Sequence, residues 1–74
     1  MKTEKWIFSV ERKEIHYVRY TLESYDGMAV VRTLDPRAGL IEVTIVPGCE
    51  SEARKLIDAL REQEGLAITE ARPL

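Results

Sequence analysis

The chain has 74 residues, which is enough for one domain spanning residues 1–74 with one hydrophobic core. Its 45% hydrophobic and 32% charged residues are typical of a globular protein and exclude the disordered and fibrous classes. The 11 Lys and Arg and 13 Asp and Glu residues leave a formal charge of −2. Because nucleic-acid-binding domains usually carry a basic excess, we expect no nucleic-acid partner.

The sequence also lacks the patterns of membrane and secreted proteins. No apolar run approaches the ~18 residues that a membrane-spanning helix needs, and residues 1–6 do not resemble a signal peptide. The one cysteine, Cys49, cannot form an intrachain disulfide and is typical of a reducing compartment. We therefore expect a cytoplasmic protein that does not contact a membrane.

The first two predicted elements are a strand and a helix. Residues 5–11 predict a half-buried strand, because Trp6, Phe8 and Val10 recur at every second position. Residues 14–25 predict a helix, with one apolar stripe at Ile15, Val18, Leu22 and Tyr25. The same residues are rich in strand formers and also alternate, so an extended segment is the alternative.

A β-hairpin is predicted in the middle of the chain. Residues 28–34 and 40–46 are rich in strand formers, and residues 35–39 supply the Asp, Pro and closing Gly that a turn with a type I start prefers. The alternation of side chains then fixes which face of each strand meets the core. The predicted register pairs Leu34 with Leu40, Thr33 with Ile41, Arg32 with Glu42 and Val31 with Val43.

The last third of the chain predicts a helix and a short strand. Residues 50–64 carry one apolar stripe, at Ala53, Leu56, Ile57 and Leu60. Gly65 ends this helix, residues 66–71 have room for one strand, and residues 72–74 are expected to be a frayed tail.

The element order βαββαβ predicts an α+β fold, the ferredoxin-like plait: a four-stranded antiparallel sheet with two helices on one face. The apolar side of the first strand would then pack beside the apolar face of the hairpin, beneath both helices. If residues 14–25 were extended, the fold would instead be a meander of strands covered by one helix.

Two stretches carry a resemblance to a known family. Residues 22–35 (LESYDGMAVVRTLD), preceded by residues 12–15 (RKEI), resemble a family of short bacterial proteins that is classed only as a domain of unknown function. The resemblance implies a bacterial origin and a cytoplasmic location. It brings no catalytic residues and no mechanism.

The order of elements is also similar to that of ACT domains, which are small regulatory modules that pair and bind amino acids. ACT domains place a glycine in the turn between the first strand and the first helix, and residues 11–14 contain none. The similarity therefore implies pairing, but not amino-acid binding at that turn.

The sequence lacks the residues that several known functions of plait folds require. The predicted open face of the sheet presents Ile7, Ser9, Glu42 and Thr44, with no aromatic side chain on which RNA bases could stack. No Cys-x-x-Cys motif precedes the first helix to carry copper, and no glycine-rich loop could cradle a phosphate. We therefore expect no metal and no cofactor.

Two pairs of charged residues are candidate ligand-binding groups. Arg12 and Lys13 stand where the first helix begins, and backbone amides at a helix N-terminus attract anions. Arg32 and Glu42, opposite each other in the hairpin, could contact a ligand on the open sheet. The competing interpretation of both pairs is solvated surface charge without a ligand.

Cys49 and His16 are the candidates for enzymatic or redox chemistry. Cys49 lies near the start of the second helix, where the helix dipole can make a thiol reactive. Catalysis would also need a base, and His16 is the only histidine. The alternative is that Cys49 is a small residue in a helix-capping turn.

The sequence favours a non-catalytic interaction or regulatory module. Tyr17 and Tyr20 on the first helix, and Ile7 and Thr44 on the open face of the sheet, are candidate contact residues for a homodimer or another protein. A small metabolite could bind at the resulting interface. The alternative is a small enzyme or a redox-sensitive protein that uses the thiol or the basic pair named above.

Overall fold

The computed structural model describes residues 3–25 and 27–71. In chain order its elements are β1 (Glu4–Ser9), the 3₁₀ turn η1 (Arg12–Glu14), α1 (Ile15–Glu23), β2 (Ala29–Asp35), β3 (Leu40–Ile45), α2 (Glu50–Gln63) and β4 (Thr69–Ala71). The predicted order βαββαβ is confirmed. Within the described residues, no helix has the length and apolar character needed to cross a membrane.

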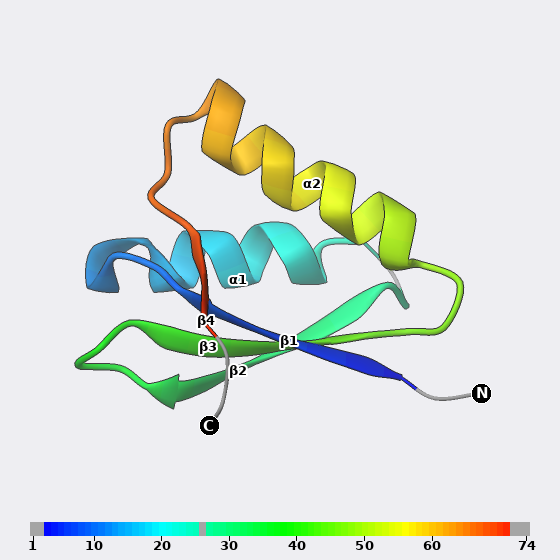
Figure 1. The fold of residues 1–74 in the computed structure, drawn as a ribbon, viewed down its shortest axis with the longest axis horizontal. Helices are drawn as coiled ribbons and strands as arrows, with labels where there is room; N and C mark the ends of the chain where they lie inside the picture. The colour runs from blue at the N-terminus through cyan, green and yellow to red at the C-terminus, as the bar shows by residue number, and fades with distance from the viewer. Residues whose placement is uncertain (1–2, 26, 72–74) are drawn as a thin grey trace.

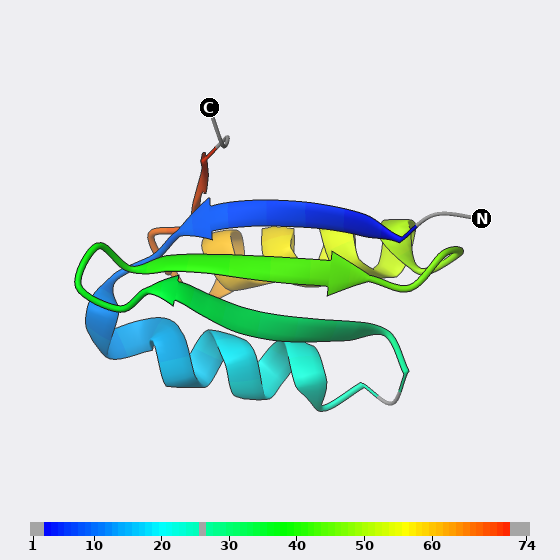
Figure 2. The same ribbon diagram turned by 90° about the horizontal axis from the view of Figure 1, so that it is seen from below.

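The four strands form one antiparallel sheet in the order β2-β3-β1-β4. β1 and β3 are therefore the central strands, and β2 and β4 are the edges. Both helices lie on one face of the sheet (Figure 1), and Figure 2 shows the sheet from its open face. This is the predicted ferredoxin-like plait, and the alternative meander with one helix is wrong.

The hydrophobic core lies between the helices and the sheet. Phe8 and Val10 are buried in it, and Trp6 packs against it from its edge, so the predicted orientation of the first strand is confirmed. The other buried side chains are Ile15, Val18, Leu22, Met28, Ala29, Val31, Ile41, Val43, Ile45, Ala53, Ile57, Leu60 and Ile68.

The first strand is shorter than residues 5–11, and it begins and ends earlier. β1 spans Glu4–Ser9, and the chain then turns into η1, where Glu14 donates its backbone N–H to the carbonyl of Glu11 at 2.8 Å. Val10 still donates its N–H to the carbonyl of Gly39 at 2.8 Å. This hydrogen bond ties the end of β1 to the hairpin turn.

The first helix ends before the predicted Tyr25. The hydroxyl of Ser24 donates a hydrogen bond to the carbonyl of Thr21 at 2.7 Å, and the backbone N–H of Ser24 bonds to the same carbonyl. Such a local bond competes with continuation of the helix, so α1 ends at Glu23. Tyr25 consequently lies outside the apolar stripe and is exposed.

The hairpin register is as predicted along most of β2 and β3, and wrong at the turn. The structure pairs Ala29 with Ile45, Val30 with Thr44, Val31 with Val43, Arg32 with Glu42 and Thr33 with Ile41. A bulge then adds a residue to β2, so Asp35 rather than Leu34 lies opposite Leu40. The Asp35 carboxylate accepts hydrogen bonds from the backbone N–H groups of Arg37 and Ala38, at 3.0 and 3.3 Å. Asp35 therefore belongs to the turn as well as to the strand.

The last strand is also shorter than predicted, because the start of residues 66–71 is bonded to α2. Leu66 donates its backbone N–H to a carbonyl of α2 at 3.1 Å, and the carbonyl of Ile68 accepts a hydrogen bond from Nε of Arg61 at 2.8 Å. Pairing with β1 therefore begins only at Thr69. The tail predicted at residues 72–74 lies outside the described residues.

Candidate functional site

Cys49 and His16 lie at opposite ends of the sheet. β1 leads into α1 and β3 leads into α2, and these two strands are antiparallel neighbours. The N-termini of the two helices therefore lie at opposite ends of the molecule, as Figure 1 shows. The fold excludes a hydrogen-bonded Cys–His pair, which a Cys–His catalyst would need.

Cys49 is the residue that caps α2. It is a free, partly buried thiol, and its side chain makes no capping hydrogen bond. Its backbone N–H bonds to the carbonyl of Val46 at 3.0 Å, and its own carbonyl accepts the N–H of Ala53 at 2.9 Å. The side chain lines a shallow hollow of about 490 Å³ together with Met28 and Leu56. These contacts fit a small residue in a capping turn.

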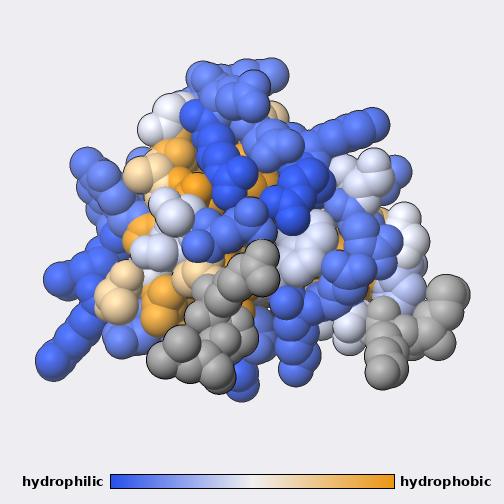
Figure 3. All heavy atoms as spheres, in the orientation of Figure 1, coloured by the Kyte–Doolittle hydropathy of each residue, from blue (hydrophilic) through white to orange (hydrophobic). Residues whose placement is uncertain are grey.

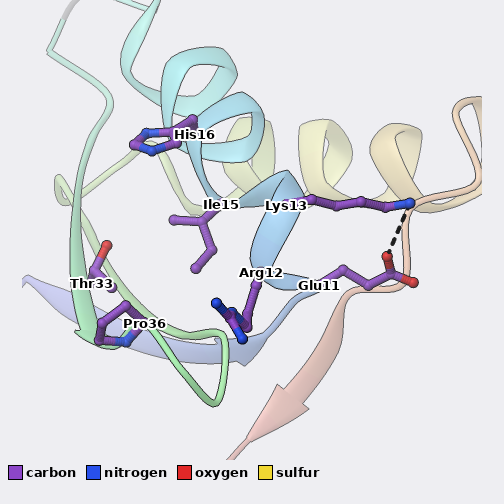
Figure 4. Close-up of a pocket in the computed structure, with 7 residues that line it drawn as sticks. All are labelled: Glu11, Arg12, Lys13, Ile15, His16, Thr33 and Pro36. Carbon is purple, nitrogen blue, oxygen red and sulfur yellow. Dashed lines mark ion pairs between the residues drawn. The ribbon is translucent and has the colours of Figure 1, made fainter.

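A larger hollow, of about 710 Å³, lies where η1 and the start of α1 meet the β2–β3 turn. It is lined on the helical side by Glu11, Arg12, Lys13, Ile15 and His16, and on the hairpin side by Thr33 and Pro36 (Figure 4). The Arg12 side chain lies between the hairpin turn and α1. Within the part of the chain that the structure describes, it makes no ion pair and no side-chain hydrogen bond. A guanidinium, an imidazole and a hydroxyl are thus brought to one concave surface.

The side chains of the predicted pair, Arg12 and Lys13, point in different directions (Figure 4). Lys13 extends away from the centre of this hollow, and its Nζ pairs with Oε2 of Glu11 at 3.7 Å (Figure 4). Both members of this ion pair are highly exposed, so it contributes little to stability. Both residues line the hollow, but the ammonium group of Lys13 is held toward Glu11 and away from its centre.

One row of residues crosses the open face of the sheet. The backbone pairing places Arg32, Glu42, Ile7 and Ala71 side by side on β2, β3, β1 and β4. Nε of Arg32 lies 3.6 Å from Oε1 of Glu42; the side chain of Arg32 is 71% exposed, whereas that of Glu42 is 15% exposed. The predicted pair is therefore present, and its positive end faces solvent.

The rest of the open face of the hairpin is largely aliphatic. Val30 is 63% exposed and lies beside the partly buried Thr44. Leu34 and Val46, at the ends of the hairpin strands, are also exposed. Among the described residues, every exposed large aliphatic side chain belongs to this hairpin or directly follows it.

The two tyrosines of α1 that are predicted contact residues differ in how available they are to a partner. The hydroxyl of Tyr17 donates a hydrogen bond to Oε1 of Glu64, just after α2. This hydrogen bond, together with partial desolvation, raises the pKa of the Tyr17 phenol above its usual 10.0. Tyr20 is 74% exposed, so it is the more available of the two for a partner.

The outer edge of β2 is occupied by a side chain of α1. Oε2 of Glu23 accepts the backbone N–H of Val31 at 2.9 Å, and Oε1 of Glu23 lies 3.3 Å from Nε of Arg19. A free strand edge normally exposes unpaired N–H and C=O groups that can pair with another chain. Glu23 covers the middle of this edge.

The described residues contain no group of three or more His, Cys, Asp or Glu side chains that could hold a metal ion. Within the same residues no polar or charged side chain is buried. The expected absence of a cofactor remains a prediction.

A family model described as a domain of unknown function (DUF4911) matches residues 8–63, from β1 to the last residue of α2. The chain belongs to this family. The predicted resemblance is confirmed, and the matched residues include the large hollow, the hairpin and the Glu23 contact. No curated protein and no solved structure matches the chain.

Two features of the surface were not predicted from the sequence. Thr33 and Pro36 join Arg12 because the antiparallel pairing of β1 and β3 brings η1 and the hairpin turn to one end of the sheet. The predicted order of elements already implies that these two segments lie at the same end of the sheet. The contact of Glu23 with Val31 has no local sequence signal, because it depends on how α1 lies against the edge strand.

Proposed function

We propose that the protein is a cytoplasmic, non-catalytic interaction module that forms homodimers through the open face of its sheet. The observation that carries the proposal is the concentration of exposed aliphatic side chains on the hairpin, next to one ion pair. A concentration of exposed apolar side chains is typical of contact sites between proteins. The side of the molecule seen in Figure 3 is mostly hydrophilic, with apolar atoms in separate patches.

The open face is self-complementary in charge. Arg32 and Glu42 are cross-strand partners, as are Val30 and Thr44. A two-fold axis that runs along the strands between β2 and β3 exchanges such partners, so Arg32 of one copy faces Glu42 of the other. The same axis places Val30 over Thr44. Two copies can therefore bury apolar surface without bringing like charges together.

The size of this face indicates a weak and reversible dimer. With the axis between β2 and β3, these are the two strands that overlap with the partner, and strand spacing and rise give them an area about 10 Å wide and about 20 Å long. This footprint is below that of standard stable interfaces, which bury about 800 Å² per partner. We therefore expect dissociation at low micromolar concentrations and association as the concentration rises.

Sedimentation velocity over a wide concentration range tests the proposal. The wild-type protein is expected to shift from monomer toward dimer, and Val30→Glu is expected to remain monomeric because it buries a charge at the interface. Tyr20→Glu is the matched control, since it adds the same charge at a similarly exposed position on α1, away from the open face. The proposal is contradicted if the wild-type protein stays monomeric. It is also contradicted if Tyr20→Glu loses association while Val30→Glu keeps it.

The large hollow supports a second candidate function, the binding of a small carboxylate or phosphate compound. Arg12 can offer a forked pair of N–H donors to such an anion, and His16 and Thr33 can add further donors. We expect phosphate or acetate to shift the amide NMR signals around this hollow. The shifts should disappear in Arg12→Ala and persist in Lys13→Ala, because Lys13 is paired with Glu11. Equal shifts in both variants would count against this site.

A further inference from the structure

The backbone of β2 has a defined set of groups that point away from the sheet. In an antiparallel pair, successive residues alternate between facing the partner strand and facing away from it. Val31 donates its N–H to Glu23 of α1 rather than to β3. Ala29 and Thr33, two residues to either side, have the same orientation. These three residues form the outward edge of β2.

This edge has the geometry to pair with itself. If two copies met with a two-fold axis at Val31, Val31 would lie opposite its own counterpart and Ala29 would lie opposite Thr33. The outward N–H and C=O groups of both strands would then pair, and the two sheets would become one continuous sheet. The occupant that fits this edge is therefore the β2 strand of a second copy.

Glu23 stands in the way of that pairing. Its carboxylate already holds the central N–H of the edge at 2.9 Å, and its second oxygen is oriented by Arg19 at 3.3 Å. A neighbouring strand would have to displace this carboxylate from the Val31 N–H. α1, which supplies Glu23, runs beside β2 (Figure 2).

We infer that Glu23 closes the β2 edge against strand pairing with a second copy, and that its loss opens a second mode of self-association. The side chain thus determines which surface of the sheet is available to another copy. The inference does not depend on the proposed dimer through the open face, because the edge and the face are different surfaces.

The test uses Glu23→Ala and Glu23→Met, neither of which can accept the Val31 N–H, and Glu23→Gln as the matched control, which keeps an acceptor oxygen. All three are made in the Val30→Glu background, where association through the open face is blocked. Sedimentation velocity is expected to show a dimer for the first two variants at concentrations where Glu23→Gln is monomeric. Urea unfolding checks that each variant is folded. If Glu23→Ala does not fold, Glu23→Met takes its place in the comparison.

Hydrogen exchange at Val31 provides a second readout. In Glu23→Ala or Glu23→Met the Val31 amide should exchange at least tenfold faster than in Glu23→Gln at low concentration. At high concentration, pairing with a second β2 strand should slow it again. Folded variants without an acceptor that remain monomeric would overturn the inference, as would a Glu23→Gln variant that associates equally well.

Discussion

Replacing Gly39 with alanine is expected to lower the free energy of unfolding by at least about 3 kcal/mol, since left-handed strain and a backbone clash add together. Gly39 has a φ of +72°, and a Cβ atom built on it would lie well inside van der Waals contact of the carbonyl oxygen of Val10. The clash involves backbone on both sides, so no side-chain movement can relieve it. Relief would require the hydrogen bond between Val10 and Gly39 to lengthen.

Gly65→Ala is the matched control for this substitution. Gly65 has a φ of +68°, and no atom lies within 4 Å of the position that an alanine Cβ would take there. The free energy of unfolding of Gly65→Ala should fall only by the cost of the left-handed backbone strain, about 1–2 kcal/mol. Urea unfolding of both variants measures the difference. Equal losses would mean that the end of β1 does not approach the hairpin turn as closely as described.

Replacing Leu22 with alanine is expected to cost about 3 kcal/mol of unfolding free energy, within the range for large-to-small changes at fully buried leucines. Leu22 is 0% exposed and lies on the side of α1 that faces the sheet. Removing its side chain leaves a cavity among residues that are already closely packed. Because a small domain is stable by only about 5–15 kcal/mol, the loss is a large fraction of the total.

Leu34→Ala is the control for this prediction, because it removes the same atoms at a position that is 38% exposed. Its cost should be below about 1 kcal/mol, as for other surface substitutions. Both variants are compared by urea unfolding at a concentration where the protein is monomeric. A Leu22→Ala variant as stable as Leu34→Ala would contradict the placement of α1 on the core.

The fold was largely predictable because apolar residues recur with the period of a strand in one segment and with the period of a helix in the next. Trp6, Phe8 and Val10 alternate as a strand, and Ile15, Val18 and Leu22 recur at the spacing of a helix, although that segment is also rich in strand formers. The helix forms there because its three apolar side chains are all buried against the sheet. Burial on the sheet thus decides between two local preferences.

The ends of the elements were less predictable, since they depend on single hydrogen bonds. Ser24 ends α1 through the carbonyl of Thr21, and Arg61 holds the carbonyl of Ile68 near α2 before β4 begins. The bulge before Asp35 depends on the bonds that its carboxylate makes within the turn. None of these bonds changes the hydrophobic pattern, so the pattern could not reveal them.

The candidate sites were predictable where they follow from strand register, and unpredictable where distant elements meet. Arg32 and Glu42 pair as the alternation required. By contrast, the separation of Cys49 from His16 follows from the antiparallel placement of β1 and β3, not from the residues themselves. The Glu23 contact also depends on packing, since α1 must reach the edge of β2.

The most direct test of the proposed homodimer uses two charge-reversal variants, Arg32→Glu and Glu42→Arg, in sedimentation equilibrium. Each variant alone brings like charges together across the proposed two-fold axis, so each should associate at least tenfold more weakly than wild type, a cost of about 1.4 kcal/mol or more. In an equimolar mixture, a pair made of one copy of each variant again joins opposite charges at both contacts. We predict that the mixture associates more strongly than either variant by itself. If the mixture is as monomeric as its components while wild type dimerises, the copies do not meet through the open face of the sheet.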